Sequence, residues 1–200
     1  MNGDAFRGLV TRQRACREFS DDPVGDDDIE RCLAAATYAP SAENKQPWEF
    51  VVVRDAARRA AIGELTRRAW DAGGRAFSEG RLPQHLLQEV DRGATGGVAA
   101  APVLVVVAAD TERGLPQTVP SSIFPAIQNL LLMATALGLG SALTTLSVGY
   151  AAELQALCSL PTTVVPVAVI PLGYPARPLG RPRRDDFRGH THREAYGSVW

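Results

Sequence analysis

The clearest repeat of apolar positions predicts a helix between Asp26 and Ala39. Three consecutive aspartates suit its first turn, and Pro40 disfavours helical backbone in the residue before it. The face that this helix buries is expected to consist of four residues at the i, i+3, i+4, i+7 spacing: Ile29, Cys32, Leu33 and Ala36.

Three runs of strand length follow along the chain. Residues 48–53 are aromatic and β-branched and come directly after a loop-like stretch from Pro40 to Pro47. Residues 102–108 are almost continuously apolar, as expected of a strand whose two faces are both covered. Residues 163–170 form the third run, and the proline at position 166 indicates an edge, a bulge or a strand start.

The stretch between the first two strands is mixed. Sequence rich in alanine and arginine predicts a helix that runs after Asp55 through about Trp70 and on toward Phe77. A short further helix is indicated by Leu86, Leu87 and Val90. The glycines at positions 93, 96 and 97 predict a mobile loop.

A long interval, from Gly114 to Ala176, contains Glu153 as its only charged residue. A membrane span is one interpretation, but polar residues, prolines and glycines interrupt the interval, and no apolar run reaches about 18 residues. We instead expect a helix over residues 122–137 that is apolar on nearly all sides, with Ile127, Leu130, Leu131, Ala134 and Leu137 innermost. A small chain rarely encloses such a helix alone, so a subunit interface is the natural place for part of its surface.

Composition describes one globular domain spanning residues 1–200. The chain is 46% hydrophobic and 22% charged, and 21 basic against 22 acidic residues give a net charge of -1. No global field therefore favours nucleic acid or a membrane as a partner. Three widely spaced cysteines fit no metal-ligand pattern and favour a cytoplasmic location. The segment from Tyr174 to Trp200, rich in Pro, Gly and Arg, cannot build a core and must lie on another surface.

Two arginine clusters are candidates for binding an anion. Arg12, Arg14 and Arg17 are spaced so that their guanidinium groups can converge, although a solvated basic face is the alternative in a chain with a single lysine. The second cluster, at residues 181–184, contains a proline that stiffens the backbone and lowers the cost of holding two guanidinium groups on a phosphate. A disordered basic tail is the alternative there.

Two uncharged segments are candidates for contacting a flat ligand. The loop at residues 40–48 offers Ser41, Asn44 and Gln46, whose side chains suit the polar edge of a flavin or pterin ring, or it is a plain helix-to-strand connection. The second segment, residues 137–145, lacks the third glycine of a dinucleotide fingerprint, and no P-loop occurs. Its glycines allow either a close backbone approach to a ligand or simple helix termination.

Taken in order, these segments resemble the nitroreductase family. The resemblance rests on R-x-x-R-x-F at Arg14 to Phe19, on Asp22-Pro23-Val24, on Ala39 to Asp55, on Ser122 to Leu132 followed by Leu137 to Gly140, and on Leu172 to Ala176. It implies an α+β fold of three layers, with a central mixed sheet flanked by helices. It also implies an intertwined homodimer, in which the central helix lies in the interface and residues 174–200 form an arm that packs on the partner.

The resemblance further implies an FMN site between two subunits. Arg14, with Arg181 or Arg183, would hold the phosphate, and Arg17 would stabilise negative charge near the pyrimidine edge of the ring. The other cofactor-binding positions implied are Arg12 and Ala15 in the arginine segment, Ser41 and Asn44 from the second subunit, Gln46 in the same loop, and Leu143, Thr144 and Thr145 close to the ring. No metal and no side chain acting as acid or base is implied.

As for the reaction, the resemblance implies that NADH or NADPH reduces the flavin, which then reduces a nitroaromatic, a quinone or a similar acceptor. A dehalogenase-like or flavin-consuming enzyme is the alternative within the fold, and a flavin-storing or flavin-sensing protein without turnover is the alternative outside catalysis. The chain departs from the family pattern at Gln13, at Glu43 and in Ser141 to Thr145. A carboxylate at position 43 would be unfavourable beside an anionic reduced flavin unless it points to solvent.

Overall fold

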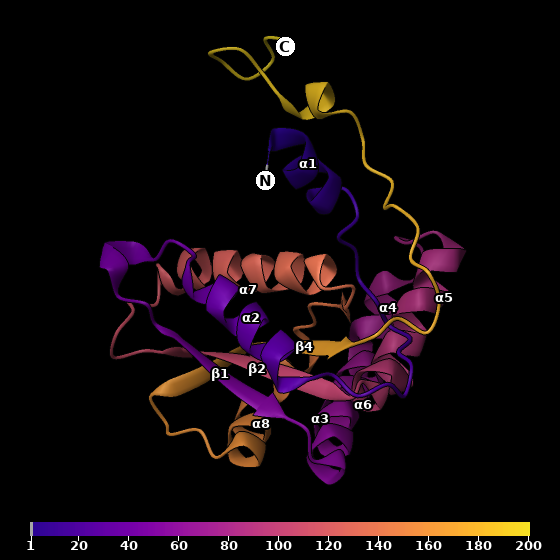
Figure 1. Ribbon diagram of the computed structural model, residues 1–200, viewed down its shortest axis with the longest axis vertical. Coiled ribbons are helices and arrows are strands. Elements are labelled where there is room, and N and C mark those ends of the chain that lie inside the picture. Colours follow the sequence, from indigo (N-terminus) through magenta and orange to yellow (C-terminus); the bar gives the residue numbers. More distant parts are fainter. Residues whose placement is uncertain (1) are drawn as a thin grey trace.

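A four-stranded sheet lies between two layers of helices in the computed structural model, which describes residues 2–200 (Figure 1). The strands are β1 (Trp48–Val53), β2 (Val103–Asp110), β3 (Gly140–Ser141) and β4 (Val164–Gly173). Their order in the sheet is β1-β2-β4-β3. This three-layer α+β arrangement is the predicted one.

One detail of that prediction is wrong, because the sheet is antiparallel and not mixed. All three pairs of neighbouring strands run antiparallel, and within residues 2–200 the parallel pairing is a single isolated bridge between Ala15 and Ser141. Long helical connections can return a chain in either direction, so the spacing of strands along the sequence does not determine their orientation. The expected irregularity at Pro166 is confirmed as a break in register between β2 and β4.

The continuous apolar run of β2 is explained by burial on both faces. Val103, Val105 and Val107 point into the core beneath one helical layer, whereas Leu104 and Val106 point into the core beneath the other. Side chains alternate across a strand, so a strand covered on both sides needs apolar residues at every position. Each such side chain contributes roughly 1.5–3 kcal/mol when it is fully buried.

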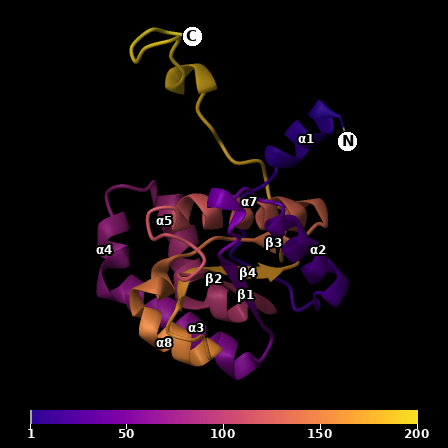
Figure 2. The ribbon, with the colours of Figure 1, turned by 90° about the vertical axis from the view of Figure 1, so that its left-hand side faces the viewer.

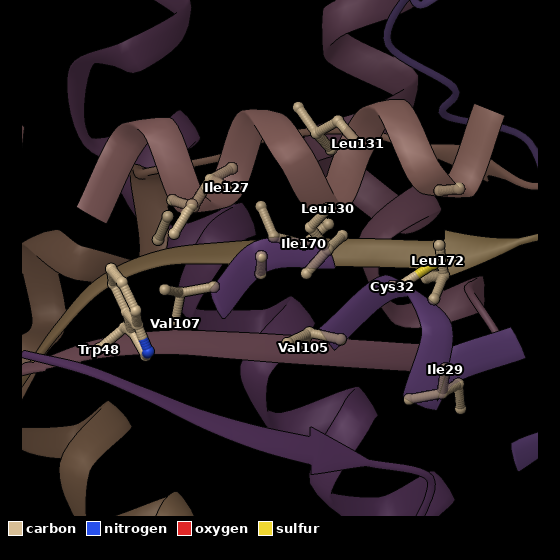
Figure 3. Packing of buried hydrophobic residues seen from close by; sticks show 14 of the residues in the cluster. Ile29, Cys32, Trp48, Val105, Val107, Ile127, Leu130, Leu131, Ile170 and Leu172 are labelled. Carbon is tan, nitrogen blue, oxygen red and sulfur yellow. The ribbon is translucent and has the colours of Figure 1, made fainter. Parts of the chain in front are cut away.

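Helices α2 (Asp26–Thr37) and α7 (Val119–Ala136) cover one face of the sheet. Figure 3 shows side chains of both helices meeting those of β1, β2 and β4. The predicted inner face of α2 is confirmed, since Ile29, Cys32 and Ala36 are buried and Leu33 packs partly buried against the same core. Burial of Cys32 beside Asp28 raises the pKa of its thiol to about 12.

Helices α3 (Ala56–Ala69), α6 (Val98–Ala100) and α8 (Ala151–Cys158) cover the opposite face. Between α3 and α6 the chain forms η2 (Trp70–Gly74), α4 (Arg75–Ser78), α5 (Gln84–Arg92) and η3 (Gly93–Gly97). The prediction of a mobile loop at Gly93 to Gly97 is wrong, because these residues continue α5 as a helical turn. Glycine occurs there for close packing, as the site shows.

The apolar helix α7 has two unlike faces. Its inner face is buried against the sheet, whereas Phe124 is 39% exposed and Gln128 lies on the surface. The expectation of burial on nearly all sides is therefore not met within one chain. Within residues 2–200, α7 is the one helix long and apolar enough to cross a membrane. The core helix of a globular domain meets the same two criteria of length and composition.

Both ends of the chain leave the body on the same side (Figure 2). Helix α1 (Gly3–Val10) has no buried residue. From Ala176 the chain runs without regular secondary structure to η5 (Phe187–His190), and then turns back on itself so that His192 forms an antiparallel bridge with Val199. Its large side chains are exposed, including Tyr196 and Val199. As predicted, this segment has no core of its own.

Candidate functional site

The first predicted arginine segment lies along the short edge strand β3. The amide of Cys16 donates to the carbonyl of Ser141 at 2.9 Å, which fixes the backbone between Arg14 and Arg17. A Cβ atom at Gly140 would lie 2.6 Å from the Cys16 sulfur, so this close approach requires glycine. Burial raises the pKa of the Cys16 thiol, and Cys16 is therefore the small buried residue that its sequence context favours and not an activated thiolate.

This segment forms the wall of a cavity of about 120 Å³, called here the arginine cavity. Its lining residues are Arg14, Ala15, Cys16, Arg17, Glu18, Glu89, Arg177, Pro178, Leu179 and Gly180. Arg14 donates to the carbonyl of Gly180 at 3.4 Å and so joins the start of the C-terminal segment to the arginine segment. Burial lowers the pKa of the Arg17 guanidinium, while Glu89 opposes that effect.

A second space, of about 300 Å³, adjoins the first and is called here the apolar cavity. It is lined by Cys16, Arg17, Thr66, Trp70, Gly74, Phe77, Ser78, Val90, Gly93, Ala94, Gly97, Val98, Ala142, Leu143, Thr144, Thr145, Leu146 and Pro171. Cys16 and Arg17 line both cavities, so the two spaces meet at these residues. The pair accommodates a molecule with a flat, largely apolar part and an anionic part.

The segment Leu143 to Thr145 lines the apolar cavity and carries two backbone donors without a protein acceptor within residues 2–200. The amides of Ala142 and Thr144 donate to β4, at 3.3 Å and 3.0 Å. Alternation along an extended chain turns the amides of Leu143 and Thr145 the other way, and within residues 2–200 neither has a protein acceptor. Two free donors beside an apolar cavity suit the polar edge of a heterocycle.

The wall opposite Leu143 is built by residues 66–98, the region whose role was the least predictable. A Cβ atom at Gly93 would lie 2.6 Å from the Arg17 side chain, and one at Gly97 would lie 2.3 Å from the Arg17 carbonyl oxygen. These two glycines are thus packing positions for Arg17. The sequence signal for them was the glycine-rich run itself, but a run of glycines does not reveal which segment approaches it.

A hydrogen-bonded network anchors the same wall. The indole N–H of the buried Trp70 donates to Asp91 at 2.9 Å, and Arg75 donates to the same carboxylate oxygen at 2.8 Å. Trp70 belongs to η2, Arg75 to α4 and Asp91 to α5. The network therefore ties together three short elements of this wall.

The predicted loop residues Ser41, Asn44 and Gln46 lie elsewhere. This loop packs near the beginning of α7 (Figure 1), where the amide of Ala42 donates to the Ser122 hydroxyl at 3.2 Å. The apolar cavity is instead lined by Ala142 to Leu146, which follow the end of α7 in the chain. Helix α7 has 18 residues and is therefore about 27 Å long. One chain thus does not bring the two groups of predicted residues together.

The remaining predicted arginines also lie outside the two cavities. Arg12 donates to the carbonyl of Gly8 at 3.2 Å within the exposed turn after α1. Arg181 lines an open groove of about 550 Å³ together with Gln13, Gln128 and Arg184, whereas Arg183 lines neither this groove nor the two cavities. No three His, Cys, Asp or Glu side chains within residues 2–200 gather as metal ligands.

Comparison with known proteins decides the family. A family model described as the nitroreductase family matches residues 10–174. The chain belongs to the nitroreductase family. It is 35% identical over 146 residues to the 5,6-dimethylbenzimidazole synthase of Rhodospirillum rubrum, covering 68% of this chain and 67% of that protein. It is 32% identical over 173 residues to an Archaeoglobus fulgidus protein named as an NADH dehydrogenase/NAD(P)H nitroreductase, covering 84% and 83%.

Solved nitroreductase structures share the fold. One from Desulfovibrio desulfuricans, in complex with FMN, superposes with a TM-score of 0.74 at 23% identity and covers 98% of this chain and 99% of that chain. The match to the nitroreductase family includes the arginine segment, the polar loop and the apolar cavity, but it ends before Arg181 and Arg183. The C-terminal arginines are therefore the predicted positions with the least support.

Proposed function

We propose that this member of the nitroreductase family is an FMN-dependent oxidoreductase that passes hydride from NAD(P)H to a small oxidised acceptor such as a nitroaromatic or a quinone. The observation that carries the proposal is the junction of an arginine-lined cavity with an apolar cavity at Cys16 and Arg17. FMN has the matching chemistry, because a flat ring system and an anionic phosphate are joined in one molecule. When bound, the flavin supplies the hydride chemistry.

Residues of this chain would bind and orient the flavin. Arg14 and the start of the C-terminal segment suit the phosphate end, with Arg181 or Arg183 as further candidates. The free amides of Leu143 and Thr145 suit the polar edge of the ring. Arg17 holds a desolvated positive charge where the two cavities meet, which suits the negative charge that a flavin gains on reduction.

We further propose that two copies of the chain complete each site. The loop that carries Ser41, Asn44 and Gln46 contacts Ser122 near the beginning of α7, whereas Arg17 lines cavities whose wall includes Ala142 to Leu146, beyond the end of that 18-residue helix. An antiparallel arrangement of two α7 helices would bring the loop of one copy to the cavities of the other. It would also cover Phe124 and give the coreless C-terminal segment a surface. The buried, unpaired cysteines favour the cytoplasm as the location of this dimer.

The first test is whether the purified protein is yellow and releases FMN on denaturation. Oxidation of NADH and of NADPH is then followed with and without menadione or a nitroaromatic. We expect turnover that depends on the acceptor. Bound FMN without such turnover would favour a storage or sensor role, and a colourless protein that stays colourless with added FMN would contradict the proposal.

A flavin-consuming or otherwise specialised reaction is the second candidate. The observation that favours it is the 35% identity to a protein named as a synthase. Total flavin is measured by chromatography before and after aerobic turnover with NADPH. Full recovery supports the reductase, whereas progressive loss of flavin supports the specialised reaction.

A further inference from the structure

The arginine cavity contains carboxylates as well as guanidinium groups. Glu18 is engaged by Arg92 at 3.0 Å and by Arg177 at 3.4 Å. Glu89 is the acid that contacts the other two arginines of the cavity. Its Oε2 atom lies 3.3 Å from Nη2 of Arg14 and 3.8 Å from Nη1 of Arg17.

In these contacts both partners are shielded from water, whereas each other ion pair within residues 2–200 has at least one side chain that is more than a third exposed. The side chains of Arg14, Arg17 and Glu89 are 27%, 26% and 26% exposed, respectively. Pairs elsewhere on the surface, such as Arg75 with Glu79, expose about half of each side chain. Screening by solvent is therefore weaker at Glu89, and its charge has a larger effect on neighbouring groups.

The helix that carries Glu89 is well placed to influence both cavities. Glu89 lines the arginine cavity, and the next residue, Val90, lines the apolar cavity. Helix α5 has no buried residue, so the chain does not need Glu89 for core packing. A carboxylate that faces two arginines without a packing role requires a chemical explanation.

We propose that Glu89 sets the affinity of this site for flavin, as an internal anion that holds Arg14 and Arg17 and must be outcompeted by the anionic parts of FMN. The inference rests on the proposed function. The carboxylate neutralises part of the charge that attracts the phosphate, so it weakens FMN binding. It also lies near Arg17, so it reduces the stabilisation that Arg17 gives to the reduced flavin. Glu89 is thus a positioning residue that limits how tightly the cofactor is held.

The test compares Glu89→Gln with the matched control Glu79→Gln. Glu79 lies at the end of α4, pairs with Arg75 at 3.0 Å and lines neither cavity. Flavin-depleted protein is titrated with FMN by fluorescence quenching, and the midpoint potential of the bound flavin is measured by dye equilibration. We expect Glu89→Gln to lower the Kd for FMN about fivefold and to move the potential to more positive values. Glu79→Gln should change neither.

Glu89→Asp keeps the charge on a shorter side chain, and we expect its Kd to lie between those of wild type and Glu89→Gln. It also serves as the test if Glu89→Gln does not fold. Unchanged or weaker FMN binding by Glu89→Gln, or a potential that does not rise, would overturn the inference. It would leave the proposed function intact as long as wild-type protein binds FMN. A wild-type protein that binds no FMN would overturn both.

Discussion

The two ends of helix α7 differ in how completely one chain builds them. At its end, near β3, Arg17 is enclosed by neighbours close enough that a single extra carbon at Gly93 or Gly97 would collide with it. At its beginning, the polar loop is exposed, and Glu43, Asn44 and Gln46 adopt left-handed backbone conformations with φ near 50°. One end is a preformed cavity, and the other is a strained surface loop.

The proposed dimer assigns different roles to these two ends. A cavity wall packed to contact needs nothing further to hold its shape. Three non-glycine residues with positive φ cost energy and persist where the surroundings fix them or where the geometry is used. The loop is held by local hydrogen bonds, among them those from the Gln46 amide to the Ser41 hydroxyl and from the Asn44 amide to the Ser41 carbonyl, both at 3.0 Å. We expect substitutions at the two ends to have effects of different size and kind.

The largest expected effect is on FMN affinity, when one variant damages the cavity end and another variant damages the loop end. Arg17→Ala removes the charge at the cavity end, and Asn44→Gly removes the side chain at the loop end while tolerating its positive φ. Arg17→Ala should weaken FMN binding about 10- to 100-fold, as expected for the loss of a charged hydrogen bond. A heterodimer of the two variants, purified through two different tags, should regain one intact site and bind FMN at that site with wild-type affinity.

A heterodimer of Arg17→Ala and Arg14→Ala is the matched control. Both changes lie at the cavity end, so neither copy can supply what the other lacks. Wild-type FMN affinity in this control heterodimer would show that the two ends of α7 do not share a flavin. The same conclusion would follow if the heterodimer of Arg17→Ala and Asn44→Gly did not regain that affinity.

The next effect is on folding of the cavity end. Gly97→Ala would place a Cβ atom 2.3 Å from the Arg17 carbonyl oxygen, and backbone must move to relieve that contact. We expect the free energy of unfolding to fall by about 1–3 kcal/mol in urea denaturation. At Gly96 a Cβ atom would meet nothing within 4 Å, so Gly96→Ala should be neutral or stabilising. Equal effects of the two substitutions would mean that the wall is less closely packed.

The cavity end also shows the limit of sequence-based prediction. Hydrophobic periodicity placed α2 and the middle of α7 correctly, because their buried faces repeat with the period of the helix. Aromatic and β-branched residues placed β1. It could not reveal that Gly93 and Gly97 pack on Arg17, about 80 residues earlier in the chain. Nor could it indicate Glu89, since one acid on a polar helix does not show which arginines it will meet.

Residue order predicted more of the site than periodicity did. Two of the predicted segments, Arg14 to Arg17 and Leu143 to Thr145, lie at least 126 residues apart in the sequence. The first lines the arginine cavity and, through Cys16 and Arg17, the apolar cavity, and the second lines the apolar cavity. The strand direction was not predictable, because a helical connection returns the chain either way. The loop at Ser41 was predicted to act from a second subunit, and its position at the far end of α7 agrees with that without testing it.

A smaller effect is expected from Ser41→Ala. The substitution removes the acceptor for the Gln46 amide but leaves that exposed amide free to bind water. The free energy of unfolding should therefore fall by at most about 1 kcal/mol. The loop would lose one of its internal hydrogen bonds, and FMN affinity should fall about two- to fivefold. Ser121→Ala removes a comparable local bond, from the hydroxyl to the Thr118 carbonyl at 2.9 Å, and should leave FMN affinity unchanged.

The smallest expected effect is from Glu43→Gln, which tests the departure that a carboxylate in this loop represents. The Glu43 side chain is 76% exposed and lies 3.8 Å from the Lys45 ammonium group, so solvent and Lys45 both screen its charge. We expect the free energy of unfolding to change by less than about 0.5 kcal/mol and FMN affinity by less than about twofold. Fluorescence titration of the dimer checks this against Glu89→Gln. If Glu43→Gln raised FMN affinity as much as Glu89→Gln, the carboxylate of the loop would have to face the flavin when two copies meet. The loop would then oppose cofactor binding just as the cavity end does.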